Sequence, residues 1–328
     1  MKFRTEIEVK KVLDPIDHDN KILTIGSCFA ENIAEYFSAS RFDILGNPFG
    51  VLYNPTSIYN SLKFAVDEEE FSESDLIKNQ SEWHSFYHHS DFSNHDKTLV
   101  LSNINTSIKS THSFLRDADI IILTFGTSYV YKHLERGIVV SNCHKIPQKD
   151  FTHFRLSFND TVDSIRDTLN LLKEINPNVK FILTVSPVRH LKDGANNNQL
   201  SKSNLLLAIN EIVNTESNAS YFPAYEIVMD DLRDYRFYNS DLVHPNKIAT
   251  DYIWEKFTAS FCSDKCLQTM KEVSKIVSAK NHRVRNSNSD EHQKFVALII
   301  NKIESLQKKH HHLMLEDDLD YFKSQQIS

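Results

Sequence analysis

Two side chains that can act as nucleophiles, the hydroxyl of Ser27 and the thiol of Cys28, lie next to each other in the sequence. The run before them, 21–25, is short, apolar and typical of a strand, and apolar residues recur at helical spacing over 30–37. Gly26 makes the turn between the two. A side chain in such a turn lies at a helix N-terminus, where unpaired N–H groups and the helix dipole stabilise a thiolate or an oxyanion. The same sequence also fits a plain helix N-cap, because serine is a common capping residue.

Asp241 and His244 have the spacing of the other half of a catalytic triad. Pro245 keeps His244 out of the helix expected after it. A carboxylate three residues before an imidazole can hold its Nδ1–H and leave Nε2 free to take a proton from a nucleophile. Asp150 and His153 repeat the spacing, but no helix follows them at once. We therefore prefer Asp241 and His244 as the orienting residue and the base.

Glycine is scarce, with only 6 residues in the chain of 328. Four of the six follow strand-like runs: Gly26, Gly46, Gly50 and Gly126. A glycine at such a position lets the backbone approach a ligand and turn an N–H toward a developing oxyanion. Each of the four could equally serve only a strand-to-helix turn.

Together these residues resemble the GSCFA family, whose name spells the pentapeptide at 26–30, and through it the SGNH (GDSL-type) hydrolase superfamily. The resemblance spans about residues 1–262 and places Cys28 at the nucleophilic serine of the superfamily, with Ser27 at the preceding aspartate. The remaining blocks fall on Gly46 or Gly50, on Gly126, Thr127 and Ser128, and on Asp241 and His244.

Two departures from the superfamily pattern affect the expected chemistry. The nucleophile position holds a cysteine, and Ser128 replaces the asparagine whose side chain would donate to the oxyanion. Asn47 is a candidate replacement for that donor. The resemblance implies a hydrolase or acyltransferase acting on an ester, such as an O-acyl group of a carbohydrate or cell-envelope precursor.

Three interpretations of the turn remain open. Cys28 would react through a thioester, with a thiol pKa lowered by the helix N-terminus and by His244. Ser27 would need His244 as general base and would form an ordinary ester intermediate. In the third interpretation neither residue reacts, and the chain is a non-catalytic module that binds a carbohydrate or another ligand.

Composition narrows the class of protein. The formal net charge of −7 offers no general basic surface for nucleic acid. No apolar run approaches the length of about 20 residues that spans a membrane. The first residues lack the apolar core of a signal peptide, so we expect a cytoplasmic protein. The four cysteines are then expected to be reduced thiols.

Strand-like and helical patterns alternate along the chain, which predicts an α/β fold of three layers, α/β/α, around a parallel sheet. The expected strands are 22–25, 42–45, 119–125, 180–185 and 220–225, and the expected helices are 28–39, 55–66, 159–175, 200–217 and 247–261. Because ligands bind at the carboxyl ends of parallel strands, the motifs should meet at one edge of the sheet.

Three further residues are candidates for binding substrate. Residues 67–97 are expected to be an irregular insertion that could form a lid over the site. This segment contains His84. His144 follows a hairpin-like pattern, and Arg189 follows the strand at 180–185. The histidines lack a convincing zinc spacing, so we expect no metal, and the resemblance implies no cofactor.

The sequence changes character after the motifs. We expect a catalytic domain over 1–262 and a helical C-terminal extension over 263–328, with a linker or loop at 280–289. Apolar residues from Phe295 to Leu306 mark an amphipathic helix. This extension could pack on the catalytic domain, form a homo-oligomer or dock a partner. We expect the domain's own ligand to be a small-molecule or glycan ester, not nucleic acid.

Overall fold

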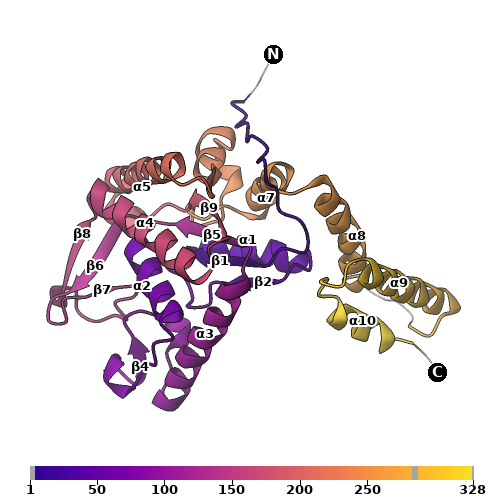
Figure 1. The fold of residues 1–328 in the computed structure, drawn as a ribbon, viewed down its shortest axis with the longest axis horizontal. Coiled ribbons are helices and arrows are strands. Elements are labelled where there is room, and N and C mark those ends of the chain that lie inside the picture. The colour runs from indigo at the N-terminus through magenta and orange to yellow at the C-terminus, as the bar shows by residue number, and fades with distance from the viewer. Residues whose placement is uncertain (1–3, 283–286, 327–328) are drawn as a thin grey trace.

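A parallel sheet of five strands forms the centre of the molecule in a computed structural model, which describes residues 4–282 and 287–326 (Figure 1). The strands are β1 (Ile22–Gly26), β2 (Ile44–Gly46), β5 (Ile120–Phe125), β9 (Lys180–Val185) and β10 (Ala219–Phe222). Their order across the sheet is β10-β9-β5-β1-β2, and every neighbouring pair is parallel. Their carboxyl ends therefore meet at one edge.

Helices cover both faces of this sheet. The long helices are α1 (Cys28–Ala39), α2 (Pro55–Val66), α3 (Lys97–Asp117), α4 (Phe158–Ile175), α5 (Ala195–Thr215) and α7 (Lys247–Phe261). Successive strand residues point to opposite faces. Leu23 and Ile25 thus enter a core formed with α2, α3, α4 and α5, whereas Ile22 enters a core formed with α1 and α7. The predicted α/β class with a parallel sheet is confirmed.

Two small antiparallel sheets lie outside the central one. The first pairs β3 (Leu76–Asn79) with β4 (Glu82–Ser85), and the second has the order β7-β6-β8, from β6 (Tyr129–His133), β7 (Val139–Val140) and β8 (Phe151–Arg155). Short helical turns lie at Glu73–Asp75, Ser90–Phe92, Gln148–Asp150, Leu191–Asp193, Ala224–Glu226, Ile227–Asp231 and Tyr235–Phe237.

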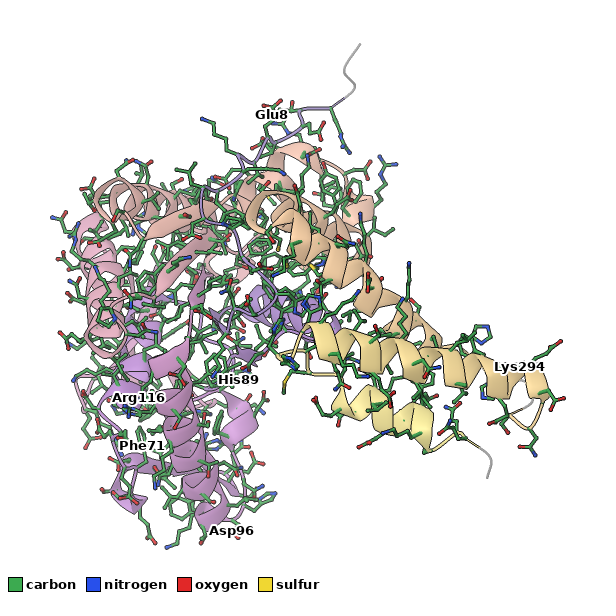
Figure 2. All side chains as sticks on the ribbon, turned by 45° about the vertical axis from the view of Figure 1, so that its right-hand side comes forward. Glu8, Phe71, His89, Asp96, Arg116 and Lys294 are labelled. Carbon is green, nitrogen blue, oxygen red and sulfur yellow. The ribbon has the colours of Figure 1, made fainter. Side chains whose placement is uncertain are left out.

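The region from 67 to 117 differs most from the sequence expectation. The segment expected to be irregular contains the β3–β4 hairpin, and the 21-residue helix α3 was not predicted at all. Figure 2 labels Phe71 and His89 in this region, with Asp96 and Arg116 near the two ends of α3. The apolar stripe of α3 is thin because many serine, threonine and asparagine residues separate its buried positions. Asp96 caps the helix by accepting the N–H of Thr98 at 2.8 Å.

Three helices form a C-terminal lobe at one side of the molecule: α8 (Asp264–Lys280), α9 (Asp290–Lys309) and α10 (Glu316–Lys323) (Figure 1). Cys266 in the first turn of α8 belongs to the core under α7, whereas Val273 and Ile276 belong to a separate core shared with α9 and α10. Helix α8 therefore joins the two bodies. In the expected linker at 280–289, residues 283–286 lie outside the described part of the chain.

A buried carboxylate ties the lobe to the central domain. Asp318 of α10 is fully buried, and its two oxygens accept hydrogen bonds from Arg41 Nε at 2.5 Å and Nη2 at 2.8 Å. Lys280 donates to the same carboxylate at 3.0 Å. Burial alone would raise the pKa of Asp318, but hydrogen bonds from Arg41 and Lys280 outweigh it and lower the pKa. Arg41 follows the end of α1, so the lobe is attached at the opposite end of that helix from Cys28.

Replacing Asp318 by asparagine should loosen the lobe. The change leaves the charges of Arg41 and Lys280 without their partner and should cost about 3 kcal/mol, as for breaking a buried ion pair. Since the pKa is lowered in the folded state, the contribution of Asp318 is present at neutral pH and is lost as the pH falls through the folded pKa. Urea unfolding at pH 7 and limited proteolysis of 263–328 measure the effect. The exposed Asp320→Asn is the control, and equal stability of the two variants would contradict the role of Asp318.

Candidate active site

The turn after β1 can be built only with glycine. Gly26 has a φ of 145°, and a Cβ placed on it would lie 2.1 Å from the carbonyl oxygen of Thr124 in β5. The same carbonyl oxygen accepts a hydrogen bond from the N–H of Ser27 at 3.0 Å. This close approach of β1 and β5 fixes where α1 begins.

Ser27 and Cys28 have different environments in this turn. The Ser27 side chain is fully buried, and its hydroxyl accepts the N–H of Phe29 at 3.3 Å, as an N-cap does. Cys28 is the first residue of α1 and is half-buried. Its side chain lines a cavity of about 510 Å³ that His244 also lines. The structure thus brings Cys28 and His244 to one cavity and gives Ser27 a capping contact.

Asp241 holds the imidazole of His244. Asp241 Oδ2 lies 2.7 Å from His244 Nδ1, and Oδ1 accepts the backbone N–H groups of Val243 at 2.9 Å and of His244 at 3.0 Å. These hydrogen bonds, the backbone ones first, lower the pKa of Asp241 to about 2. No hydrogen bond to His244 Nε2 is found in the described part of the chain. An imidazole held at Nδ1 with Nε2 open can act as a general base.

Asn47 has the geometry of a side-chain donor beside the turn. Its Oδ1 accepts the N–H of Gly26 at 2.8 Å, which orients the amide. Its buried Nδ2 has no hydrogen-bond partner of normal geometry among the described residues. It lies near enough to Glu31 to oppose the rise that burial causes in the pKa of that carboxyl. An amide oriented in this way beside the turn is suited to a developing negative charge.

The backbone of the other glycine blocks offers fewer donors. The N–H of Gly126 and that of Thr127 both donate to Tyr53 O, at 2.7 and 2.9 Å, and the N–H of Gly50 donates to Asn47 O at 2.8 Å. The buried Ser128 hydroxyl bonds to Ser201, at 3.2 Å from its Oγ. Gly46 ends β2 at the outer edge of the sheet. The structure therefore leaves Asn47 as the side-chain donor of these blocks.

The expected direction of the pKa shift at Cys28 was wrong. We expected the helix N-terminus and His244 to lower the thiol pKa, but burial first and the carboxyl of Glu31 second raise it above its ordinary value. Hydrogen bonds from backbone N–H groups and the charge of Lys202 oppose that rise without cancelling it. The resting thiol is therefore protonated and needs a base to become a nucleophile.

His84 and His144 do not line the Cys28 cavity. They stack on each other with ring centroids 4.5 Å apart, and His84 Nδ1 lies 2.7 Å from the hydroxyl of Ser93. His144 has a φ of 47° and lines a second cavity of about 480 Å³, together with Tyr53 and His190. Burial first lowers the pKa of His144 to about 4, so it is neutral near pH 7.

Several residues near Cys28 were not found from the sequence. Lys202 is fully buried in α5, and its charge acts on Cys28. Tyr53 and His190 pack edge to face, with ring centroids 5.2 Å apart. A lysine in the buried stripe of α5, between Asn198 and Leu205, was a signal that the sequence did contain. Arg189, which the sequence did single out, is half-buried beside Lys202.

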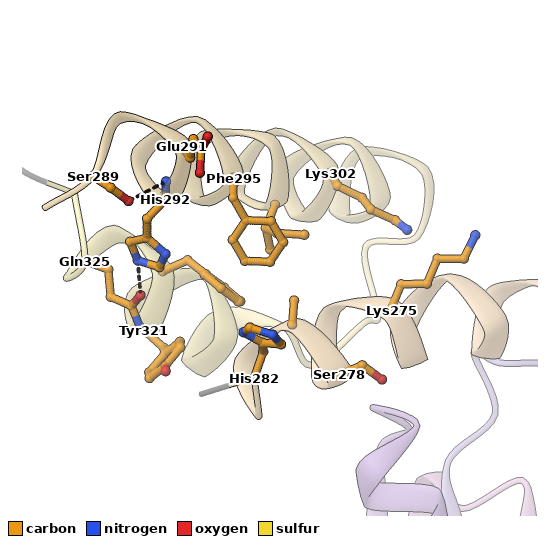
Figure 3. A pocket seen from close by; sticks show the side chains of 13 residues that line it. Lys275, Ser278, His282, Ser289, Glu291, His292, Phe295, Lys302, Tyr321 and Gln325 are labelled. Carbon is orange, nitrogen blue, oxygen red and sulfur yellow. Dashed lines mark hydrogen bonds between the residues drawn. The ribbon is translucent and has the colours of Figure 1, made fainter. Parts of the chain in front are cut away.

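A third cavity lies in the C-terminal lobe, remote in sequence from the motifs. It lies between α8, α9 and α10 (Figure 3). Its volume is about 1660 Å³. His292 of α9 contacts Gln325 Oε1 at 3.0 Å, and its N–H donates to Ser289 Oγ at 3.2 Å. Within 4–282 and 287–326, no cluster of histidine, cysteine or acidic residues has the arrangement of a metal site. Over the same ranges no helix has the length and apolar character of a membrane span.

Comparison with protein families decides the relationship that the motifs suggested. Residues 21–257 match the GSCFA family, and 273–327 match the GSCFA domain protein, C-terminal domain. The chain belongs to the GSCFA family. A solved structure from Streptococcus pneumonia, described provisionally as a platelet activating factor, is 12% identical to this GSCFA protein. The alignment covers 74% of this chain and 83% of the other, with a TM-score of 0.40. No curated protein matches the sequence.

Removing the Glu31 carboxyl from the GSCFA protein should make Cys28 easier to deprotonate. In Glu31→Gln the burial of the thiol remains but the neighbouring negative charge is gone, so the pKa of Cys28 should fall. The rate of iodoacetamide alkylation at Cys28, followed by mass spectrometry across pH, should then rise at a lower pH than in the wild type. Glu35→Gln, on the same helix and cavity, is the matched control. An unchanged profile in Glu31→Gln would refute this account of the thiol.

Proposed function

We propose that this GSCFA protein is an SGNH-type hydrolase or acyltransferase that acts on an ester through Cys28, His244 and Asp241. The observation that carries the proposal is that Cys28 and His244 line one cavity, while the Ser27 hydroxyl is buried in a capping contact. The hydrogen bond between His244 Nδ1 and Asp241 at 2.7 Å adds to this support. The placement in the SGNH superfamily is part of the proposal.

In the proposed first half-reaction, His244 Nε2 takes the thiol proton as Cys28 attacks the carbonyl carbon of the ester. The electron pair of the C=O bond moves onto oxygen, and this oxyanion is stabilised by the backbone N–H of Cys28, the first residue of α1, and by Asn47 Nδ2. Collapse of the intermediate breaks the bond to the alcohol, which leaves with the proton from His244. The acyl group remains on Cys28 as a thioester.

The second half-reaction uses the same base. His244 takes a proton from water, or from the hydroxyl of an acceptor, which attacks the thioester carbon. Collapse releases a carboxylic acid in the first case and a new ester in the second, and the proton returns to the Cys28 sulfur. The raised pKa of Cys28 fits this scheme, because a neutral thiol is deprotonated only when His244 and the ester are both in place.

We further propose that the substrate is an O-acylated carbohydrate or cell-envelope precursor. The second cavity supports the proposal with room for the rest of such a molecule. Tyr129 and Tyr131 are among its lining residues, together with Tyr53, which lies near enough to Cys28 for the thiolate charge to affect its pKa. Aromatic and polar linings are usual for small-molecule sites.

We also keep the proposed division into a catalytic domain, 1–262, and a C-terminal extension, 263–328. The described residues of the proposed catalytic machinery lie between Gly26 and His244. The separate core of α9 and α10 supports the division. The cut at 262 would remove Cys266 from the core under α7, so α8 contributes to the stability of both parts.

Substitution of the three residues tests the mechanism directly. After exposure to an acyl-ester or fluorophosphonate probe, mass spectrometry should find the adduct on Cys28 in the wild type and none in Cys28→Ala. His244→Ala should slow acylation by roughly 10²–10⁴-fold, because it removes the general base. Ser27→Ala should still react at Cys28 while losing about 1 kcal/mol of stability with its N-cap.

The pattern of adducts separates the alternatives. An adduct on Ser27 would transfer the nucleophile role to the hydroxyl. No adduct on either residue in the folded protein would contradict an enzyme of this class and favour a module that only binds its ligand.

A further inference from the structure

Two basic side chains, Arg189 and Lys202, lie close enough for the charge of Arg189 to act on Lys202, and neither forms an ion pair with a carboxylate in the described part of the chain. Lys202 is fully buried, and its Nζ donates to the carbonyl oxygen of Ser186 at 2.6 Å. The same Nζ lies 5.7 Å from the centre of the Tyr225 ring. Lysine is almost never fully buried unless it is paired with an opposite charge. No ion pair of Lys202 is present in the described part of the chain.

Arg189 also lacks an ion-pair partner among the described residues. It follows β9 and is half-buried, and its Nε is buried with no hydrogen-bond partner. Across 4–282 and 287–326 no salt bridge involves it. Burial first raises the pKa of Tyr225 and of Tyr238, and the charge of Arg189 opposes that rise. The same charge adds to the lowering of the Lys202 pKa that burial causes. Bringing two cations this close raises the cost of keeping both charged.

Two carboxylates of the same region are engaged by other groups. The Tyr221 hydroxyl donates to the carboxylate of Glu226, whose two oxygens lie 2.7 and 2.9 Å from it. Asp241 is held by His244 and by two backbone N–H groups. Gln199, the partner of the Tyr225 hydroxyl at 2.9 Å, is neutral. In the described structure neither Arg189 nor Lys202 therefore has a carboxylate at ion-pair distance, and the one anionic form that acts on Lys202 is the thiolate of Cys28.

The pair also borders the reacting groups. The charge of Lys202 acts on Cys28. Tyr238, which feels the charge of Arg189, pairs with Pro245, the residue after His244. The charge of Lys202 thus reaches the proposed nucleophile, and that of Arg189 reaches a residue paired with the neighbour of His244.

We propose that Arg189 and Lys202 form a subsite for a compact anionic group, a carboxylate or a phosphate, on the substrate. That this anion belongs to an ester rests on the function proposed above. Arg189 contacts the anion, because its planar guanidinium can donate two parallel hydrogen bonds to such a group. Lys202 lies deeper and adds positive potential. Bound anion would supply the missing counter-charge and bring the ester carbonyl toward Cys28.

Burial first, and Arg189 among the neighbouring charges, lower the pKa of Lys202 to about 7. An anion at Arg189 would favour the charged form of this lysine. The substrate would then bind to a site more positive than the empty one.

Anion binding can be measured without any turnover. The melting temperature of the full-length protein is recorded in rising sodium phosphate and, separately, sodium acetate, with sodium chloride keeping the ionic strength constant. A ligand that binds only the folded state raises the melting temperature with concentration. We expect a rise in the wild type, its loss in Arg189→Met, and a partial return in Arg189→Lys. The exposed Arg236→Met is the matched control and should keep the rise.

Equal shifts in the wild type and in Arg189→Met would overturn the subsite, and so would a wild-type shift no larger than that in chloride. The two anions also distinguish a phosphate from a carboxylate preference. If Arg189→Met is too unstable to measure, Arg189→Lys takes its place: a shift smaller than in the wild type supports bidentate binding by the guanidinium, whereas a full shift overturns it.

A second arm connects the subsite to the ester. Hydrolysis of 4-nitrophenyl acetate is compared with that of the mono-4-nitrophenyl ester of succinate, which carries a carboxylate. The ratio of kcat/KM for the anionic ester over the neutral one should fall roughly tenfold or more in Arg189→Met, because a charged hydrogen bond is lost. If both esters are hydrolysed but the ratio of their kcat/KM values is the same in the wild type and in Arg189→Met, the subsite is overturned while the proposed function stands. An Arg189-dependent phosphate shift with neither ester hydrolysed would support the subsite and contradict the proposed function.

Discussion

The contact between β1 and β5 at Thr124 determines where the proposed nucleophile and the Asn47 amide lie. Its carbonyl oxygen occupies the space that a side chain on Gly26 would need, and it accepts the N–H of Ser27. Helix α1 must therefore start at Cys28, with the thiol at the carboxyl edge of the sheet. Asn47 is tied to the same turn through the N–H of Gly26. A substitution at Gly26 would displace nucleophile and donor together, because both are positioned by this turn.

The surroundings of the Cys28 thiol oppose its ionisation. Burial and Glu31 keep Cys28 protonated, whereas Lys202 and the start of α1 favour the thiolate. A cysteine in this balance is inert toward general electrophiles near neutral pH and depends on His244 for activation. Since Asp241 and His244 are both close to half exposed, the base lies at the mouth of the cavity and not within the core.

Much of the fold followed from the sequence because alternation of apolar strands and amphipathic helices is a local signal. The runs at 22–25 and 120–125 gave buried strands, and 28–39 gave α1. Helix α3 was missed because its buried residues, such as Val100 and Ile104, are separated by polar ones that carry no apolar pattern. The motifs predicted which residues to examine. They could not predict that Ser128 bonds to Ser201, or that Lys202 lies near Cys28, because those contacts join segments more than seventy residues apart.

The attachment of the C-terminal lobe limits how the sequence can vary among related proteins. Arg41 has a φ of 62°, a left-handed conformation that disfavours a residue with a side chain. Its guanidinium holds Asp318, which Lys280 also contacts. Loss of the acid would leave two cations crowded at one point, and loss of Arg41 would leave a buried carboxylate with one partner fewer. Positions 41, 280 and 318 should therefore vary together among relatives, and a homologue without the lobe would be free to place glycine or asparagine at 41.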